Sequence, residues 1–170
     1  MISLLTNLLS FDRNTILKKL LLWTIIPLIV WYISLNWYQL MLIQGNSMAP
    51  TYRHLQLVVL DKHSEQYKPG DVIAFYSENL DCVLVKRIIA GPEDTAQITG
   101  GTLQINGQSC HLFPDVGLIP DAGILAEPVC LEQGQFLVLG DNLEKSVDSR
   151  NPQVGLVSEN NILGKICLPH

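Results

Sequence analysis

Two residues of this sequence, Ser47 and Lys86, are of types that together perform nucleophilic catalysis, because a neighbouring lysine can activate a serine hydroxyl. Lys86 lies in Val83–Ile89, an apolar run typical of a strand. Alternate residues of a strand share a face, so Lys86 is the single cation on an otherwise apolar face, while Arg87 points to the other. Burial disfavours the ammonium form and lowers a lysine pKa, which makes a buried lysine a usable general base.

The spacing of Ser47 and Lys86 does not by itself bring the two side chains together. Ser47 lies in Gly45–Thr51, a segment interrupted by Gly, Asn and Pro, in which Pro50 restricts the turn after the serine. An alternative interpretation makes Ser47 a turn residue and Lys86 a side chain that extends along an edge strand to reach water. Only the fold distinguishes the two interpretations.

A third polar stretch lies near the C-terminus. It contains Gly140, Asp141, Asn142, Ser146, Asp148, Ser149 and Arg150. Such residues can support a catalytic pair, and they can equally form a salt bridge that holds a loop.

The elements that must position these residues begin with an apolar N-terminal run. Residues 20–43 carry no charged side chain and would span about 36 Å as a helix, enough to cross a bilayer with some tilt. Arg13, Lys18 and Lys19 precede this run, so the positive-inside rule predicts cytoplasmic residues 1–19, a transmembrane helix over 20–43 and an extracytoplasmic domain over 44–170. A cleaved secretory signal and a buried helix are the alternatives.

The sequence after residue 44 predicts an all-β domain, because no stretch keeps a helical period. A hairpin is expected at Gly100-Gly101, between Gln97–Thr99 and Thr102–Asn106. Residues 110–130 are expected to form a long loop or small insertion. The other predicted strands are Leu55–Leu60, Asp71–Tyr76, Cys82–Ile89, Gln135–Leu139 and Ile162–Leu168.

Composition excludes several classes of protein. The 170 residues are 48% apolar and 16% charged, which rules out a disordered charged tail. The net charge is −5, with +2 on residues 1–43 and −7 on residues 44–170, which argues against a nucleic-acid partner. A basic apolar head and an acidic body suggest a domain anchored to a lipid bilayer.

Cysteine and histidine give no metal site, since no Cys-x-x-Cys and no histidine cluster is present. Two interpretations of the cysteines stay open. Cys110 and Cys130 bracket the insertion and would be the first pair to form a disulfide; alternatively, all four cysteines (the others are Cys82 and Cys167) are free and buried. The four histidines are expected to be ordinary surface residues.

Three segments resemble the boxes of type I signal peptidases. Ser47-Met48-Ala49-Pro50-Thr51 resembles their serine box, Val85-Lys86-Arg87-Ile88 is similar to their lysine box, and the 140–150 stretch resembles their C-terminal signature. Lys68-Pro69-Gly70-Asp71-Val72-Ile73 also fits the family, and the match covers nearly the whole chain from residue 38 onward.

This resemblance implies a signal-peptidase-like β-barrel domain and a membrane-bound serine endopeptidase, without cofactor, that removes signal peptides from secreted precursors. It implies cleavage after small residues at the −1 and −3 positions. Ser47 would be the nucleophile and Lys86 the general base, and Ser146 would bond to the lysine amine. Asp141, Asp148 and Arg150 would support the site, Met48 would wall it, and the backbone N–H of Ser47 would stabilise the oxyanion.

Two positions depart from the family pattern. Gly45 stands where some members carry a serine that serves as a second oxyanion donor, and this glycine variant resembles Gram-positive-type members. Glu93-Asp94 replaces the usual Gly-Asp. The short insertion favours a small, single-span member.

Other functions stay open at this point. They are a specialised peptidase for one pilin or peptide, a self-cleaving regulator of the LexA type, and a catalytically silent, membrane-tethered β domain that binds a partner. The LexA-type regulator would need a DNA-binding head where this chain has an apolar segment. The sequence gives no oligomeric state.

Overall fold

A computed structural model describes residues 13–64, 66–110 and 118–167. The chain forms two compact units, Met1–Trp37 and Tyr38–His170. Most of the predicted cytoplasmic segment, residues 1–12, lies outside the described residues.

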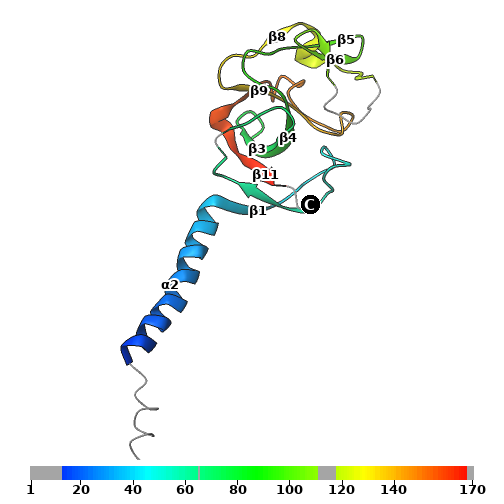
Figure 1. Ribbon diagram of the computed structural model, residues 1–170. Helices are drawn as coiled ribbons and strands as arrows, with labels where there is room; N and C mark the ends of the chain where they lie inside the picture. Colours follow the sequence, from blue (N-terminus) through cyan, green and yellow to red (C-terminus); the bar gives the residue numbers. More distant parts are fainter. Residues whose placement is uncertain (1–12, 65, 111–117, 168–170) are drawn as a thin grey trace, which may run out of the picture. The chain divides into compact units, whose positions relative to one another are not determined.

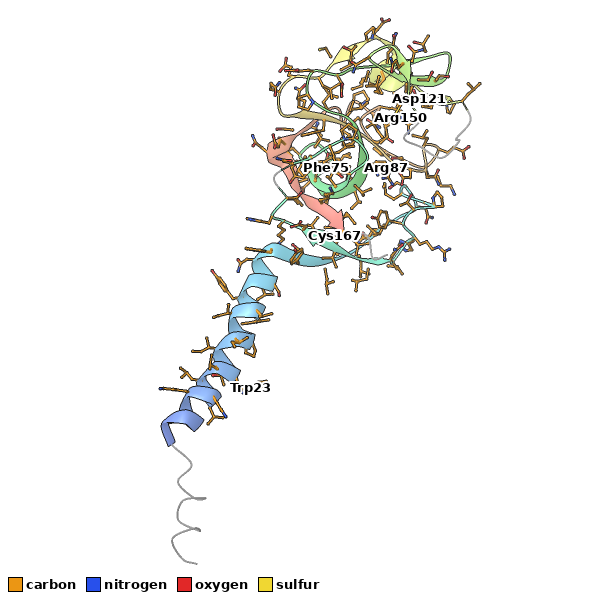
Figure 2. All side chains as sticks on the ribbon, in the orientation of Figure 1. Trp23, Phe75, Arg87, Asp121, Arg150 and Cys167 are labelled. Atoms are coloured by element: carbon orange, nitrogen blue, oxygen red, sulfur yellow. The ribbon has the colours of Figure 1, made fainter. Side chains whose placement is uncertain are left out.

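The first unit is the helix α2, Arg13–Trp37, of which Leu17–Trp37 is long and apolar enough to cross a membrane. Two of its polar side chains bond to the carbonyl group one turn earlier: Thr24 Oγ1 donates to Leu20 O (3.1 Å) and Ser34 Oγ to Val30 O (2.7 Å). These bonds suit a helix in lipid, where water cannot satisfy polar groups. Trp23 projects away from the helix (Figure 2). The helix ends six residues before the predicted position 43, because the next residues form a strand.

The second unit contains a seven-stranded sheet. Its strands are β1 (Tyr38–Leu42), β2 (Leu57–Asp61), β3 (Val72–Ser77), β4 (Cys82–Ala90), β9 (Gln135–Leu139), β10 (Val157–Ser158) and β11 (Ile162–Cys167). The strand order is β1-β2-β11-β3-β4-β9-β10, and every pair of neighbours is antiparallel. Consequently β1 and β4 run in the same direction.

A smaller sheet has the order β7-β6-β5-β8 and lies at the end of the domain away from β1 (Figure 1). Its strands are β5 (Thr95–Thr99), β6 (Thr102–Ile105), β7 (Gln108–Ser109) and β8 (Val129–Cys130). Gly100 and Gly101, which join β5 to β6, have φ angles of +59° and +77°, as a tight hairpin requires.

Three apolar clusters form the core of the domain. One lies against the small sheet, one between β3, β9 and β10, and one beside β1 and β2. The third contains Ile43, Met48 and Tyr52, which anchors the connection between β1 and β2, the segment that carries Ser47. The core therefore fixes the backbone on either side of the candidate nucleophile.

The prediction of an all-β domain after one N-terminal helix is confirmed, with two differences. Residues 118–130 are more regular than the predicted loop: they contain the 3₁₀ helix η1 (Gly123–Ala126), whose Leu125 is fully buried, and the strand β8. A second 3₁₀ helix, η2 (Glu159–Asn161), precedes β11.

The four cysteines are all free, so Cys110 and Cys130 form no disulfide. The alternative expectation was that all four are buried, but Cys82, Cys130 and Cys167 are exposed.

Candidate active site

Ser47 lies in the turn that connects β1 to β2 and is held at its backbone. Its carbonyl oxygen accepts a hydrogen bond from Asn142 N–H (2.9 Å), which ties the serine segment to the loop after β9. Gly45 has a φ of +85°, which glycine adopts without strain, and its N–H donates to His54 Nδ1 (3.0 Å). His54 therefore helps to shape the segment, although it was expected to be an ordinary surface residue. The serine side chain stays half-buried.

Lys86 reaches the serine from the middle of β4. Its Nζ donates a hydrogen bond to Ser47 Oγ at 2.8 Å, and the residue is only 3% exposed. Burial lowers the pKa of this amine to about 8, against the opposing effect of Asp148, Asp141 and Cys82, in that order. The fold thus brings together the two groups that a serine–lysine mechanism needs.

Asp141 does not touch the lysine, because a different cation holds it. Arg87 Nε and Nη2 donate to Asp141 Oδ1 (2.8 Å) and Oδ2 (2.6 Å), which makes a bidentate ion pair. The Asp141 side chain is only 1% exposed. Arg87 Nη1 also donates to the Gly70 carbonyl (2.8 Å), and the bond to Asp141 raises the arginine pKa. The pair joins β4 to the loop that carries Asn142.

Asp148 and Arg150 form a second ion pair in the same loop. Arg150 Nε and Nη2 donate to Asp148 Oδ1 (2.9 Å) and Oδ2 (3.0 Å), and Nη2 also donates to the Leu143 carbonyl (2.7 Å). Asp148 Oδ2 accepts from Gly140 N–H (3.1 Å), and Ser149 Oγ accepts from Val138 N–H (3.0 Å). These bonds hold the loop in place, as the alternative interpretation of this stretch expects.

Ser146 lies close to the site without the predicted bond. Its Oγ is buried and has no hydrogen-bond partner among the described residues, so the expected bond to Lys86 is absent. A Cβ added at Gly140 would lie 2.2 Å from Ser146 Oγ and 2.5 Å from the Ser47 carbonyl oxygen. The lack of a side chain at Gly140 therefore allows Ser146 and the backbone of Ser47 to approach each other.

A cavity of about 330 Å³ opens at the serine–lysine pair. One wall is the end of β1 and the residues after it, including Met48, and the other is Cys82–Lys86 of β4. Within the described residues, β1 pairs only with β2, and Cys82–Lys86 pair only with β3. We call this cavity, which lies between two unpaired strand edges, the substrate groove.

The alternation of backbone bonds shows which groups face the groove. Ile43 bonds to the Leu55–Gln56 segment through both its N–H and its C=O, so the backbone groups of its neighbours Leu42 and Gln44 turn the other way. Ile88 likewise bonds to the segment before β3 through both groups. Backbone groups of successive strand residues point in opposite directions, so Lys86 and Leu84 bond toward β3 as Ile88 does. The backbone groups of Val83 and Val85 therefore point toward the groove.

Sequence reasoning missed Arg87, which was noted only as pointing away from Lys86. The available signal was a buried aspartate that would need a cation, together with an arginine in an apolar strand.

Among residues 13–64, 66–110 and 118–167, no three His, Cys, Asp or Glu side chains are placed to hold a metal ion.

Comparisons with known proteins place this chain in a family. The sequence profile described as "Signal peptidase, peptidase S26" matches residues 16–170. Signal peptidase I T of Bacillus subtilis (strain 168) is 33% identical over 137 residues, covering 72% of this chain and 68% of the relative. Signal peptidase I U of the same organism is 30% identical over 148 residues, covering 82% and 79%. A solved signal peptidase I from Enterococcus faecalis V583 is 26% identical, covering 61% of this chain and 98% of that one, with a TM-score of 0.49.

The family profile and the signal peptidase I relatives define the class of this protein as a serine protease, which is a hydrolase. The chain belongs to the signal peptidase family, peptidase S26. Members of this family remove signal peptides and are membrane-anchored, in agreement with the apolar helix α2.

Proposed function

We propose that this protein cleaves signal peptides from secreted precursors with Ser47 as nucleophile and Lys86 as general base. The observation that carries the proposal is the 2.8 Å contact between Lys86 Nζ and Ser47 Oγ, made by a lysine whose pKa burial lowers to about 8. When Lys86 is neutral, its amine accepts the serine proton instead of donating one.

The chemistry proceeds in two halves. Ser47 Oγ attacks the scissile carbonyl carbon while its proton moves to Lys86 Nζ, and the Ser47 N–H donates to the oxyanion. When the intermediate collapses, the C–N bond breaks and the lysine returns the proton to the leaving amine. Water, deprotonated by the same lysine, then attacks the acyl-serine ester; the ester C–O bond breaks, and the lysine returns the proton to Ser47 Oγ. Gly45 offers no side chain as a second oxyanion donor, so a second donor must come from another part of the site.

The signal peptide binds as an added strand in the substrate groove. Leu42 and Gln44 on one edge and Val83 and Val85 on the other offer backbone donors and acceptors to it. We place it parallel to β1 and β4, both of which run toward the serine–lysine pair. Alternate side chains of an extended peptide share a face, so two small pockets on one side of the bound peptide would select small residues at −1 and −3.

Helix α2 anchors the enzyme, with residues 1–19 in the cytoplasm and the β domain on the outer side of the membrane. The basic residues before the span support this orientation. Leu40, Leu42 and Leu57 are exposed side chains of the paired strands β1 and β2, and this apolar patch suits contact with lipid close to where a precursor leaves the bilayer.

The experiment that tests the proposal is cleavage of an Ala-x-Ala precursor by the full chain in detergent. We expect Ser47→Ala and Lys86→Ala each to lower kcat/KM at least about 10³-fold, as loss of a nucleophile or its base does in other serine proteases. Matched controls are Ser109→Ala and Lys62→Ala, which change exposed residues outside the groove. Substantial activity of Lys86→Ala, with the fold intact, would rule out the lysine base. Cleavage of only one precursor in a varied set would favour the specialised peptidase.

A further inference from the structure

A second cavity, separate from the substrate groove, borders the serine segment. Its volume is about 430 Å³, and none of the residues that the structure describes lines both cavities. It is lined by Ala49, Pro50, Leu118, Pro120, Asp141, Asn142, Leu143 and Glu144.

The linings of the two cavities follow each other along the serine segment. Ser47 and Met48 line the groove, while the next two residues, Ala49 and Pro50, line the second cavity. Asn142 lines the second cavity and donates its N–H to the Ser47 carbonyl oxygen. The backbone of the serine segment is thus a shared wall.

An endopeptidase must hold chain on both sides of the bond that it cuts. A peptide that runs along the groove with its scissile carbonyl at Ser47 Oγ leaves the groove at this shared wall. We infer that the second cavity binds the first residues of the mature chain, those that follow the scissile bond. The inference rests on the proposed peptidase function and on the parallel direction of the bound peptide.

The lining of the cavity predicts what it selects. Leu118, Pro120, Pro50 and Leu143 supply apolar surface, and Leu118 is 76% exposed, so an incoming apolar side chain can cover it. Of the two carboxylates in the lining, Asp141 is already held by Arg87. Glu144 is exposed and sets the charge that a ligand meets. The cavity should therefore accept apolar or basic residues and disfavour acidic ones.

The test uses the full chain in detergent and precursor peptides with the same Ala-x-Ala sequence before the scissile bond. The peptides differ only in the second residue after the bond, which is Leu, Lys or Glu. We expect the wild type to cleave the Leu and Lys peptides about five-fold better in kcat/KM than the Glu peptide, the size of an exposed charge interaction. Glu144→Lys should invert the Lys-to-Glu ratio, and Leu118→Ser should remove the preference for Leu.

Matched controls make the same chemical changes at exposed positions outside both cavities. They are Glu132→Lys and Val147→Ser, which should keep the wild-type ratios. Wild-type ratios in Glu144→Lys and Leu118→Ser, or an equal loss for all peptides, would overturn the inference. So would a change in preference for residues before the bond, since that would place the signal peptide in this cavity. Failure of the wild type to cleave any peptide would instead overturn the peptidase proposal.

Discussion

Lys86 keeps a lowered pKa although two carboxylates in its surroundings favour the charged form. Each of these carboxylates is bound by its own arginine: Asp141 by Arg87, and Asp148 by Arg150. The positive charges of these arginines act on Lys86 in the opposite sense to the carboxylates. The effect of burial therefore prevails, and the amine stays available as a base near neutral pH.

The first prediction at this scale concerns the pH dependence of cleavage. With a pKa of about 8, only about a tenth of the lysine is neutral at pH 7. We expect kcat/KM to rise about tenfold per pH unit below pH 8 and to level off above it. Steady-state cleavage of one precursor across this range is the measurement. A flat profile, with the chemical step shown to be rate-limiting, would contradict the lysine base.

A second prediction concerns stability. The folded chain releases the Lys86 proton at about pH 8 and the unfolded chain at about 10.5, so folding at pH 7 buries a charge. The unfolded state binds more protons between these values, and wild-type stability should rise with pH across that window. Lys86→Met should raise the free energy of unfolding at pH 7 by on the order of 1–3 kcal/mol, with a smaller gain toward pH 10.

Urea unfolding of the full chain in detergent measures this gain. Lys62→Met, at an exposed position, is the matched control and should change stability little. No gain in Lys86→Met at pH 7 would show that burying the charged lysine costs the fold little.

At the scale of elements, periodicity and turn signals identified most of the sheet. Gln135–Leu139 was predicted with its observed bounds, and Cys82–Ile89 is one residue shorter than β4. β1 was missed because Tyr38–Leu42 continues the hydropathy of the span, and only its pairing with β2 makes it a strand. The residue types of Ser47 and Lys86 indicated their chemistry, but their contact depends on long-range pairing that spacing does not encode.

At the scale of elements, we predict how a substitution in the turn after β4 changes stability. Glu93 stands where the family usually has glycine, and its φ is +71°, in the left-handed region that costs a residue with a side chain about 1 kcal/mol. Glu93→Gly should raise the free energy of unfolding by about 0.5–1 kcal/mol and leave cleavage unchanged. Loss of the exposed bond from Gln133 Nε2 to Glu93 Oε1 offsets part of the gain.

Thermal unfolding of the full chain checks this prediction. Glu132→Gly is the matched control, because Glu132 is exposed and has no positive φ, so it should lose stability. A fall in stability for Glu93→Gly would mean that the side-chain bond outweighs the backbone strain.

At the scale of the whole molecule, the cysteines offer a test of orientation. All four lie after residue 81, and three are exposed and free. If the β domain is outside, a membrane-impermeant maleimide should label intact cells that express the protein. A variant with all four cysteines changed to serine supplies the background. Labelling that appears only after lysis would reverse the proposed topology.

The two unpaired strand edges at the groove have a consequence for the enzyme without substrate. Edges that can receive a peptide strand can also receive a strand from another copy of the same chain, and natural sheets usually protect such edges. Concentrated preparations should therefore self-associate through this opening, and a bound peptide should keep the particles apart. Occupancy of the groove would then govern solubility as well as turnover.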